Sequence, residues 1–144
     1  MSSPLDIIFD KGSFLPVFSH DIACAKREIL IVSPFFRKNR VLQMVQHLKI
    51  ALDKKIRVII VTRPIEDFKA KDRIALQKMI GLLKGNEISL VFKSNIHQKF
   101  AIMDQKIVWY GSVNLLSYGS AQESIMRIES PNIANELIKS IESA

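Results

Sequence analysis

The chain has 144 residues, of which 48% are hydrophobic and 24% charged, a composition that suits one compact globular domain and leaves little length for a second. Its net charge of +7 and pI near 9.7 permit a polyanionic partner without identifying one. No stretch reaches the ~18 apolar residues that cross a bilayer, and no basic, apolar leader opens the chain. We therefore expect a soluble, cytoplasmic protein with no membrane partner. The single cysteine, Cys24, cannot form an internal disulfide, and its apolar neighbours predict a buried thiol.

Strands and helices are predicted to alternate along the chain. Apolar runs bounded by Pro, Gly or polar residues predict strands, and apolar side chains at helical spacing predict helices. The expected strands are 7–9, 29–32, 56–62, 88–92, 100–103, 107–110 and 123–128. The expected helices carry apolar stripes over 14–25, 41–52, 76–83 and 133–141. This alternation implies βαβ units, and therefore an α/β fold whose mixed, mostly parallel sheet is covered by helices on both faces.

A late hairpin is predicted within residues 97–114, HQKFAIMDQKIVWYGSVN. Two apolar, strand-like runs flank a short polar turn at residues 104–106. Side chains two apart on an extended chain share a face, so His97 and Lys99 should point into the same space. Because a hairpin returns the chain to where it began, residues 111–114 are expected to lie beside them.

The polar residues of this hairpin suit a tetrahedral phosphate. A lysine offsets oxyanion charge, Ser112 and Asn114 donate hydrogen bonds, and an imidazole can attack phosphorus or carry protons near neutral pH. The pattern H-x-K-x4-D-x6-G-S-x-N resembles that of the phospholipase D superfamily. The matching residues are His97, Lys99, Asp104, Gly111, Ser112 and Asn114. The resemblance implies the three-layer phospholipase D-like fold and a phosphodiesterase.

The resemblance also implies a role for each catalytic residue. His97 would attack a phosphodiester to form a phosphohistidine, while Lys99 and Asn114 hold the phosphate oxygens and Ser112 assists. The family places an acid on the strand after G-S-x-N, which here is Glu123. That carboxylate would accept the second imidazole N–H and fix its tautomer. A solvated charge at a strand end is the alternative for Glu123.

Asp104 and Gly111 are expected to be structural residues of the motif. Asp104 lies in the predicted hairpin turn, about five residues from the histidine, and at ~3.3 Å per residue this places it well away from the phosphate. In the family, the matching aspartate resembles a scaffold residue that orders the fold. Gly111 supplies the small turn next to the phosphate.

We expect no metal and no cofactor. No Cys, His, Asp or Glu cluster in the sequence has metal-ligand spacing, and the isolated His20 and His47 are expected on helix surfaces. Lys99 already supplies the positive charge that a metal would bring to the phosphate.

However, His97 cannot both attack phosphorus and protonate the leaving oxygen, so the reaction needs a separate general acid. Family members usually combine two motifs, and this chain has one. We therefore predict a homodimer, with a second motif elsewhere in a longer parent chain as the alternative.

Basic residues in two loops are the candidate substrate contacts. Both loops follow predicted buried strands, and in parallel sheets such loops lie at the edge where ligands bind. The residues are Arg37, Lys38, Arg40 and Arg63. Together with Phe35 and Phe36, which could stack on bases if exposed, these cations suit a nucleic-acid backbone better than a lipid tail. The alternatives are core packing for the two phenylalanines and simple solvation for the cations.

Three segments resemble more narrowly the nuclease-type domains at the ends of bacterial helicase and ATPase chains. They are VTRP at 61–64, NIHQKF at 95–100 and WYGSVNLL at 109–116. This resemblance implies a DNA substrate and a helicase or ATPase region in the same parent chain. The chain would then be a single domain, 1–144, cut from a longer protein, with a natural small protein as the alternative.

Three functions remain open from the sequence. The first, and the one we favour, is a nucleic-acid phosphodiesterase, with DNA as substrate. The second is a phospholipid-processing enzyme of the phospholipase D type, for which we would expect apolar membrane-facing loops and two motifs in one chain. The third is a non-catalytic DNA-binding module of a helicase.

Overall fold

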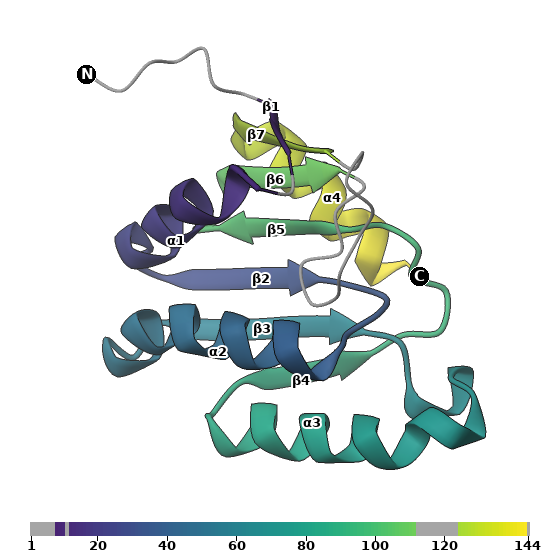
Figure 1. The fold of residues 1–144 in the computed structure, drawn as a ribbon. Helices are drawn as coiled ribbons and strands as arrows, with labels where there is room; N and C mark the ends of the chain where they lie inside the picture. The colour runs from purple at the N-terminus through teal and green to yellow at the C-terminus, as the bar shows by residue number, and fades with distance from the viewer. Residues whose placement is uncertain (1–7, 11, 112–123, 144) are drawn as a thin grey trace.

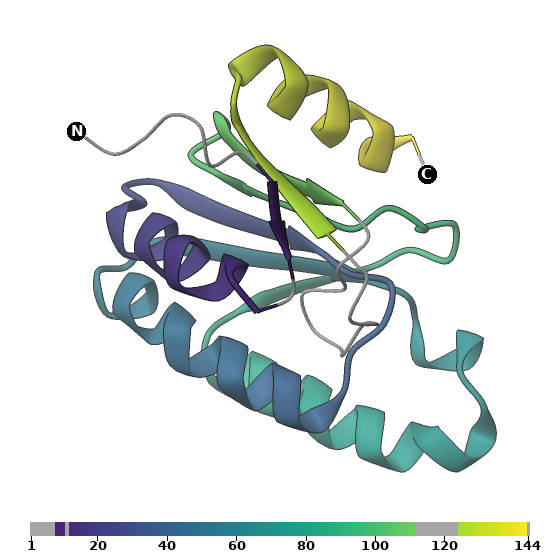
Figure 2. The same ribbon diagram turned by 45° about the horizontal axis from the view of Figure 1, so that its top comes forward.

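A mixed β-sheet between two layers of helices makes up the fold of this computed structural model, which describes residues 8–10, 12–111 and 124–143 (Figures 1 and 2). The helices of one layer are α1 (Phe14–Cys24), α2 (Lys38–Asp53) and α3 (Arg73–Gly85). On the opposite face lies α4 (Pro131–Glu142). Two short 3-10 helices, η1 (Ile65–Asp67) and η2 (Ala70–Asp72), precede α3. This arrangement confirms the predicted three-layer α/β architecture.

The strands of the sheet are arranged in the order β1-β7-β6-β5-β2-β3-β4. In chain order they are β1 (Ile8–Asp10), β2 (Glu28–Val32), β3 (Arg57–Thr62), β4 (Ser89–Phe92), β5 (Phe100–Met103), β6 (Ile107–Gly111) and β7 (Ser124–Glu129). Parallel pairing is confined to β2-β3 and β3-β4, and the other four neighbouring pairs of the described strands are antiparallel. The expectation of a mostly parallel sheet therefore needs correction. A tight hairpin joins only antiparallel neighbours, so β5 and β6 run in opposite directions, and β7 in turn pairs antiparallel with β6.

Two apolar cores lie on the two faces of the sheet. The larger core packs α1, α2 and α3 against one face, and the smaller core packs α4 against the other. All four residues of the central strand β5 are buried because helices cover both of its faces. Ala101 and Met103 belong to the larger core, whereas Phe100 and Ile102 belong to the smaller one. This alternation fixes which side chains of the preceding segment face which layer.

The ends of the predicted elements follow local chemistry. Ser130 caps α4, because its side-chain oxygen accepts a hydrogen bond from the Ile133 N–H (3.1 Å), and Pro131 occupies the first helical turn. Between β5 and β6, Asp104 and Gln105 have φ values of 54° and 58°. Two consecutive central residues with positive φ are typical of a type I′ turn, which matches the twist of the strands, and the Lys106 N–H closes this turn by donating to the Met103 carbonyl (3.1 Å). The predicted hairpin is confirmed.

Two local expectations are wrong. Cys24 is exposed at the end of α1 rather than buried. The loop after β2 is shorter than expected, because α2 already begins at Lys38 and includes Arg40. Among the described helices, none is both long and apolar enough to cross a membrane.

Candidate functional site

Three of the predicted motif residues, His97, Lys99 and Gly111, lie at one edge of the sheet. Strands β2 and β3 end at this edge, and β5 begins here because it runs antiparallel to β2, with Phe100 opposite Val32. The residues just before β5, including His97 and Lys99, therefore enter the sheet beside the loops that leave β2 and β3. Figure 1 shows this edge on the right.

His97 and Lys99 lie on the same side of the extended segment that leads into β5. Ile96 and Phe100 pack into the α4 core, and Gln98 accepts a hydrogen bond from the Ser140 hydroxyl of α4 (3.0 Å). Because these three alternate residues face α4, His97 and Lys99 face the opposite layer. The His97 side chain is exposed and that of Lys99 is half-buried. An exposed histidine and a half-buried lysine thus lie on the same side of this segment.

Gly111 lies next to Lys99 at the return of the hairpin, and its N–H donates to the Lys99 carbonyl (3.3 Å). Neighbouring β7 leaves no room for a side chain here. A Cβ on Gly111 would lie 2.4 Å from the Ser124 carbonyl oxygen and 2.7 Å from the Ile125 Cα. Both contacts are to backbone, so any larger residue would displace β7. The glycine of the motif is required by this close approach of two strands.

Ser112, Asn114 and Glu123 lie outside the described residues. The described residues on either side of them are Gly111 and Ser124. Both residues belong to the candidate site edge, since Gly111 bonds to Lys99 and is paired with Ile125, the residue after Ser124.

Asp104 lies at the other end of β5, far from His97, as its predicted position in the hairpin turn required. Its carboxylate accepts hydrogen bonds from the backbone N–H groups of Lys26 (2.9 Å), Arg27 (2.8 Å) and Glu28 (3.1 Å). Partial burial alone would raise the pKa of the Asp104 carboxyl, but these hydrogen bonds outweigh it and hold the pKa below 3.8. The contacts fasten the hairpin turn to the start of β2.

The four predicted substrate cations occupy different environments. Arg37 and Lys38 are exposed at the start of α2. The Arg63 Nε pairs with Asp67 (3.3 Å), and its guanidinium lies 5.9 Å from the centre of the Phe35 ring. Arg37 and Lys38 sit at the N-terminus of α2, where the helix dipole disfavours positive charge. Their charges therefore do not stabilise this helix.

Arg40 departs from the surface position that we expected. Its side chain is only 6% exposed, and its guanidinium lies 5.3 Å from the centre of the Phe14 ring of α1. Its Nη1 also donates to the Gln43 side chain (2.7 Å). Arg40 is therefore packed between α1 and α2 rather than exposed at the surface.

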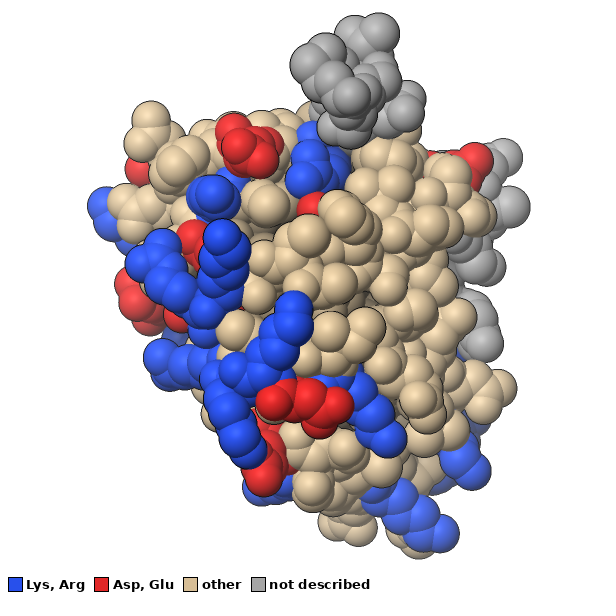
Figure 3. All heavy atoms as spheres, turned by 90° about the vertical axis from the view of Figure 1, so that its left-hand side faces the viewer, with Lys and Arg blue, Asp and Glu red and all other residues tan. Residues whose placement is uncertain are grey.

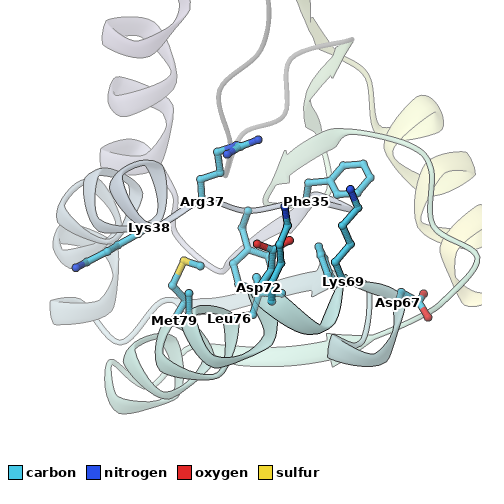
Figure 4. Close-up of a pocket in the computed structure, with 12 residues that line it drawn as sticks. Phe35, Arg37, Lys38, Asp67, Lys69, Asp72, Leu76 and Met79 are labelled. Carbon is cyan, nitrogen blue, oxygen red and sulfur yellow. The ribbon is translucent and has the colours of Figure 1, made fainter.

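A groove of about 790 Å³ opens at this edge between the loop after β2, η1, η2 and the first turn of α3 (Figure 4). Its walls combine aromatic rings with charged side chains. Phe35 is 45% exposed whereas Phe36 is 5% exposed, and both rings pack against Phe68 with centroid separations of 6.1 Å. Lys69 and Lys71 of the groove were not predicted from the sequence. The only signal was a polar, lysine-rich segment between Pro64 and the next apolar stripe.

A buried polar cluster behind the site was also missed. The Asp21 carboxylate of α1, 3% exposed, accepts hydrogen bonds from the Trp109 indole (2.8 Å) and from Nε (2.7 Å) and Nη2 (2.9 Å) of Arg127. The hydrogen bonds that Arg127 donates to Asp21 raise the pKa of the Arg127 guanidinium. The cluster ties α1 to β6 and β7. An acid on the apolar stripe of Phe14, Phe18 and Ile22 was the available signal.

The opposite edge of the sheet carries a separate group of basic residues (Figure 3). Lysine and arginine side chains gather there, with acidic side chains among them. Exposed basic residues at the starts of β2 and β3 and in the hairpin turn are Lys26, Arg27, Lys54, Lys55, Arg57 and Lys106. These residues lie at the edge opposite to Arg37, Lys38 and Arg63, so the exposed basic residues do not form one patch.

Solved structures share this fold. The phospholipase D family member Nuc from Salmonella typhimurium superposes with a TM-score of 0.70 at 20% identity, over 94% of this chain and 89% of that chain. NucT from Helicobacter pylori gives 0.70 at 17% identity, over 94% and 92%. TrmBL2, an archaeal chromatin protein that binds DNA, gives 0.64 at 13% identity, over 99% of this chain and 54% of that one.

Sequence comparison identifies the family. A comparison with curated proteins found no significant match. The family model described as "Cardiolipin synthase, PLD-like domain", in which PLD stands for phospholipase D, matches residues 18–144, which is most of the chain. The motif residues His97, Lys99, Asp104 and Gly111 all fall within this match. The chain therefore belongs to the phospholipase D-like family.

Proposed function

We propose that this protein is a metal-independent phosphodiesterase that cuts nucleic acid, with DNA as its substrate. The observation that carries the proposal is that His97 and Lys99 alternate with residues that face α4, at the edge of the sheet where Gly111 bonds to Lys99. Membership of the phospholipase D-like family supports phosphodiesterase chemistry. The structural neighbours of the chain include the phospholipase D family member Nuc, the protein NucT and the DNA-binding chromatin protein TrmBL2.

The reaction proceeds in two steps through His97. Its imidazole attacks phosphorus, the bond from phosphorus to the leaving oxygen breaks, and that oxygen takes a proton from a second imidazole. Water then attacks the phosphohistidine, the second imidazole takes the water proton, and a phosphate monoester leaves His97 free. Lys99 offsets the charge that develops on the phosphate oxygens, with Asn114 and Ser112 donating hydrogen bonds and Glu123 orienting the imidazole. The second imidazole is His97 of a second copy of the chain.

The proposal is tested by cleavage of a labelled DNA oligonucleotide in the presence of EDTA. We expect cleavage by the wild-type chain and at least a thousandfold lower rate, on the order of the loss of a catalytic nucleophile, for His97→Ala. His47→Ala is the matched control, because His47 lies on α2 and bonds to Ser19 (3.0 Å). Undiminished cleavage by the His97 variant would sink the proposal.

Phospholipid processing is the second candidate function. It is favoured by the name of the matching family model and by a further structural neighbour, a phosphatidylserine synthase from Haemophilus influenzae (TM-score 0.57, 17% identity, 95% of this chain and 36% of that chain). The cations around the groove argue for a polyanion instead. Release of headgroup from phosphatidylglycerol vesicles by wild type, with intact DNA, would establish the lipid function.

A DNA-binding module with an idle site is the third candidate, and attachment to a helicase or ATPase region stays a prediction. Such a module would bind DNA in a salt-sensitive manner, unaffected by Lys99→Ala, and would turn over no strand form.

A further inference from the structure

We propose that the groove beside the site binds one unpaired nucleotide of single-stranded DNA next to the scissile phosphate. This inference rests on the proposed function. The groove is built from Phe35 and Arg37 after β2, Phe68 and Lys69 between η1 and η2, and Asp72 before α3. It opens at the same edge of the sheet as His97 and Lys99, because β5 begins where β2 ends.

Phe35 supplies the stacking surface. Its ring makes a T-shaped contact with Phe68 (centroid separation 6.1 Å, interplanar angle 88°), and the Arg63 guanidinium lies 5.9 Å from its centre. Nevertheless, 45% of the residue remains exposed, although its neighbour Phe36 is buried. An immobilised aromatic ring with a large exposed area loses little conformational entropy when a base stacks on it. Base stacking on aromatic side chains tolerates every sequence, since each base has a π-face.

Charge around the ring suits the phosphates on either side of that base. Arg37, Lys38, Lys69 and Lys71 line the groove, against Asp67 and Asp72, and Asp67 is already paired with Arg63. Figure 4 shows Lys69 extending alongside Phe35, whereas the Arg37 side chain extends away from Asp72 and Met79 at the rim of the groove. A phosphate near Arg37 would also relieve the unfavourable placement of this cation at the start of α2.

Asp72 indicates where the base lies. It occupies the N-cap of α3, but its side chain makes no capping hydrogen bond. A carboxylate repels a phosphate but accepts a hydrogen bond from an exocyclic amino group of a base. The base edge therefore lies towards Asp72, and the phosphates lie towards the lysines and Arg37.

The arrangement requires an unpaired strand. In a duplex, each base is paired and stacked on both faces, so no π-face is free for Phe35. The groove should therefore favour single-stranded DNA over blunt duplex, and this preference should depend on Phe35.

The test compares variants of the full chain in three assays: binding of a single-stranded oligonucleotide, binding of a blunt duplex, and hydrolysis of bis(4-nitrophenyl) phosphate, which is too small to span the groove and the site. For Phe35→Ala we expect about 5- to 100-fold weaker single-strand binding. Duplex binding and hydrolysis of the small ester should not change. Ile50→Ala is the matched control, because Ile50 is 48% exposed near the other end of α2.

A second pair of variants tests the charges without removing an aromatic ring. Lys69→Gln combined with Lys71→Gln should weaken single-strand binding and lower its salt dependence, whereas Lys26→Gln combined with Lys106→Gln, on the opposite edge, should do neither. Equal effects of the two pairs, or unchanged single-strand binding by Phe35→Ala, would overturn the groove proposal. Absence of cleavage and ester hydrolysis by wild type would instead overturn the proposed function, while the binding assays would still decide the groove.

Discussion

At the scale of single residues, Asp104 is a motif residue whose carboxylate stabilises the fold. Its carboxylate accepts three backbone hydrogen bonds at the start of β2, and its pKa is held below 3.8. A lowered pKa in the folded state means that the ionised form stabilises the fold. This contribution is complete above the unfolded-state pKa and is lost as the pH falls through the lower folded-state value.

For Asp104→Asn we therefore expect a free energy of unfolding lower by about 1–3 kcal/mol at pH 7, the cost of weakening hydrogen bonds to a charged acceptor. The difference from wild type should shrink as the pH drops below 3.8. Urea denaturation at several pH values measures it. Asp53→Asn, which removes an exposed carboxylate at the end of α2, controls for the change in net charge. A difference that stays constant with pH would contradict the assigned contacts.

Other residues show what a sequence pattern cannot report. Arg40 was predicted as a substrate contact because its segment was assigned to a loop after a buried strand, but Arg40 lies in α2, and the Phe14 ring against its guanidinium comes from a different helix. Likewise, Asp21 and Arg127 are 106 positions apart, so their hydrogen bonds depend on how α1 packs against β7. In both cases the environment of the side chain is set by tertiary contacts that no local spacing encodes.

At the scale of elements, the hairpin β5–β6 was predictable because its signals are local: apolar runs on both sides of a polar turn. The reason for Gly111 was not, since it depends on the close approach of β7 from beyond residue 123. The requirement is steric rather than conformational, because the obstruction is the backbone of Ser124 and Ile125.

Two glycine substitutions should therefore have opposite effects. Gly111→Ala must displace β7 and should lower the free energy of unfolding by about 1–3 kcal/mol, as overpacking does. Gly81→Ala, in α3, meets no atom within 4 Å and should raise it by about 0.5–1 kcal/mol through helix propensity. Thermal or urea denaturation distinguishes the two. A neutral Gly111 variant would show that β7 can move freely at the site.

At the scale of the whole molecule, strand and helix order was predictable from alternating apolar patterns, whereas strand direction was not. Five of the seven described strands run in the same direction, yet only two of the six neighbouring pairs are parallel. The reason is that β7 lies between β1 and β6, β5 lies between β6 and β2, and both run in the opposite direction. This insertion positions the first residues of the candidate site. An antiparallel β5 must begin where β2 ends, so it brings His97 and Lys99 to the edge at which a parallel sheet already presents its loops.

The proposed reaction needs two imidazoles, and the motif of each chain supplies one, His97. Activity should therefore depend on the pairing of two chains. We expect a mass in solution of twice 16.4 kDa. If wild type is refolded together with a ninefold excess of His97→Ala, activity per wild-type chain should fall to about one tenth, because only that share of wild-type chains meets a wild-type partner. Differently tagged chains verify that mixing is complete. Unchanged activity per wild-type chain would show that each site works alone, and the second proton carrier would then have to be sought within the same chain.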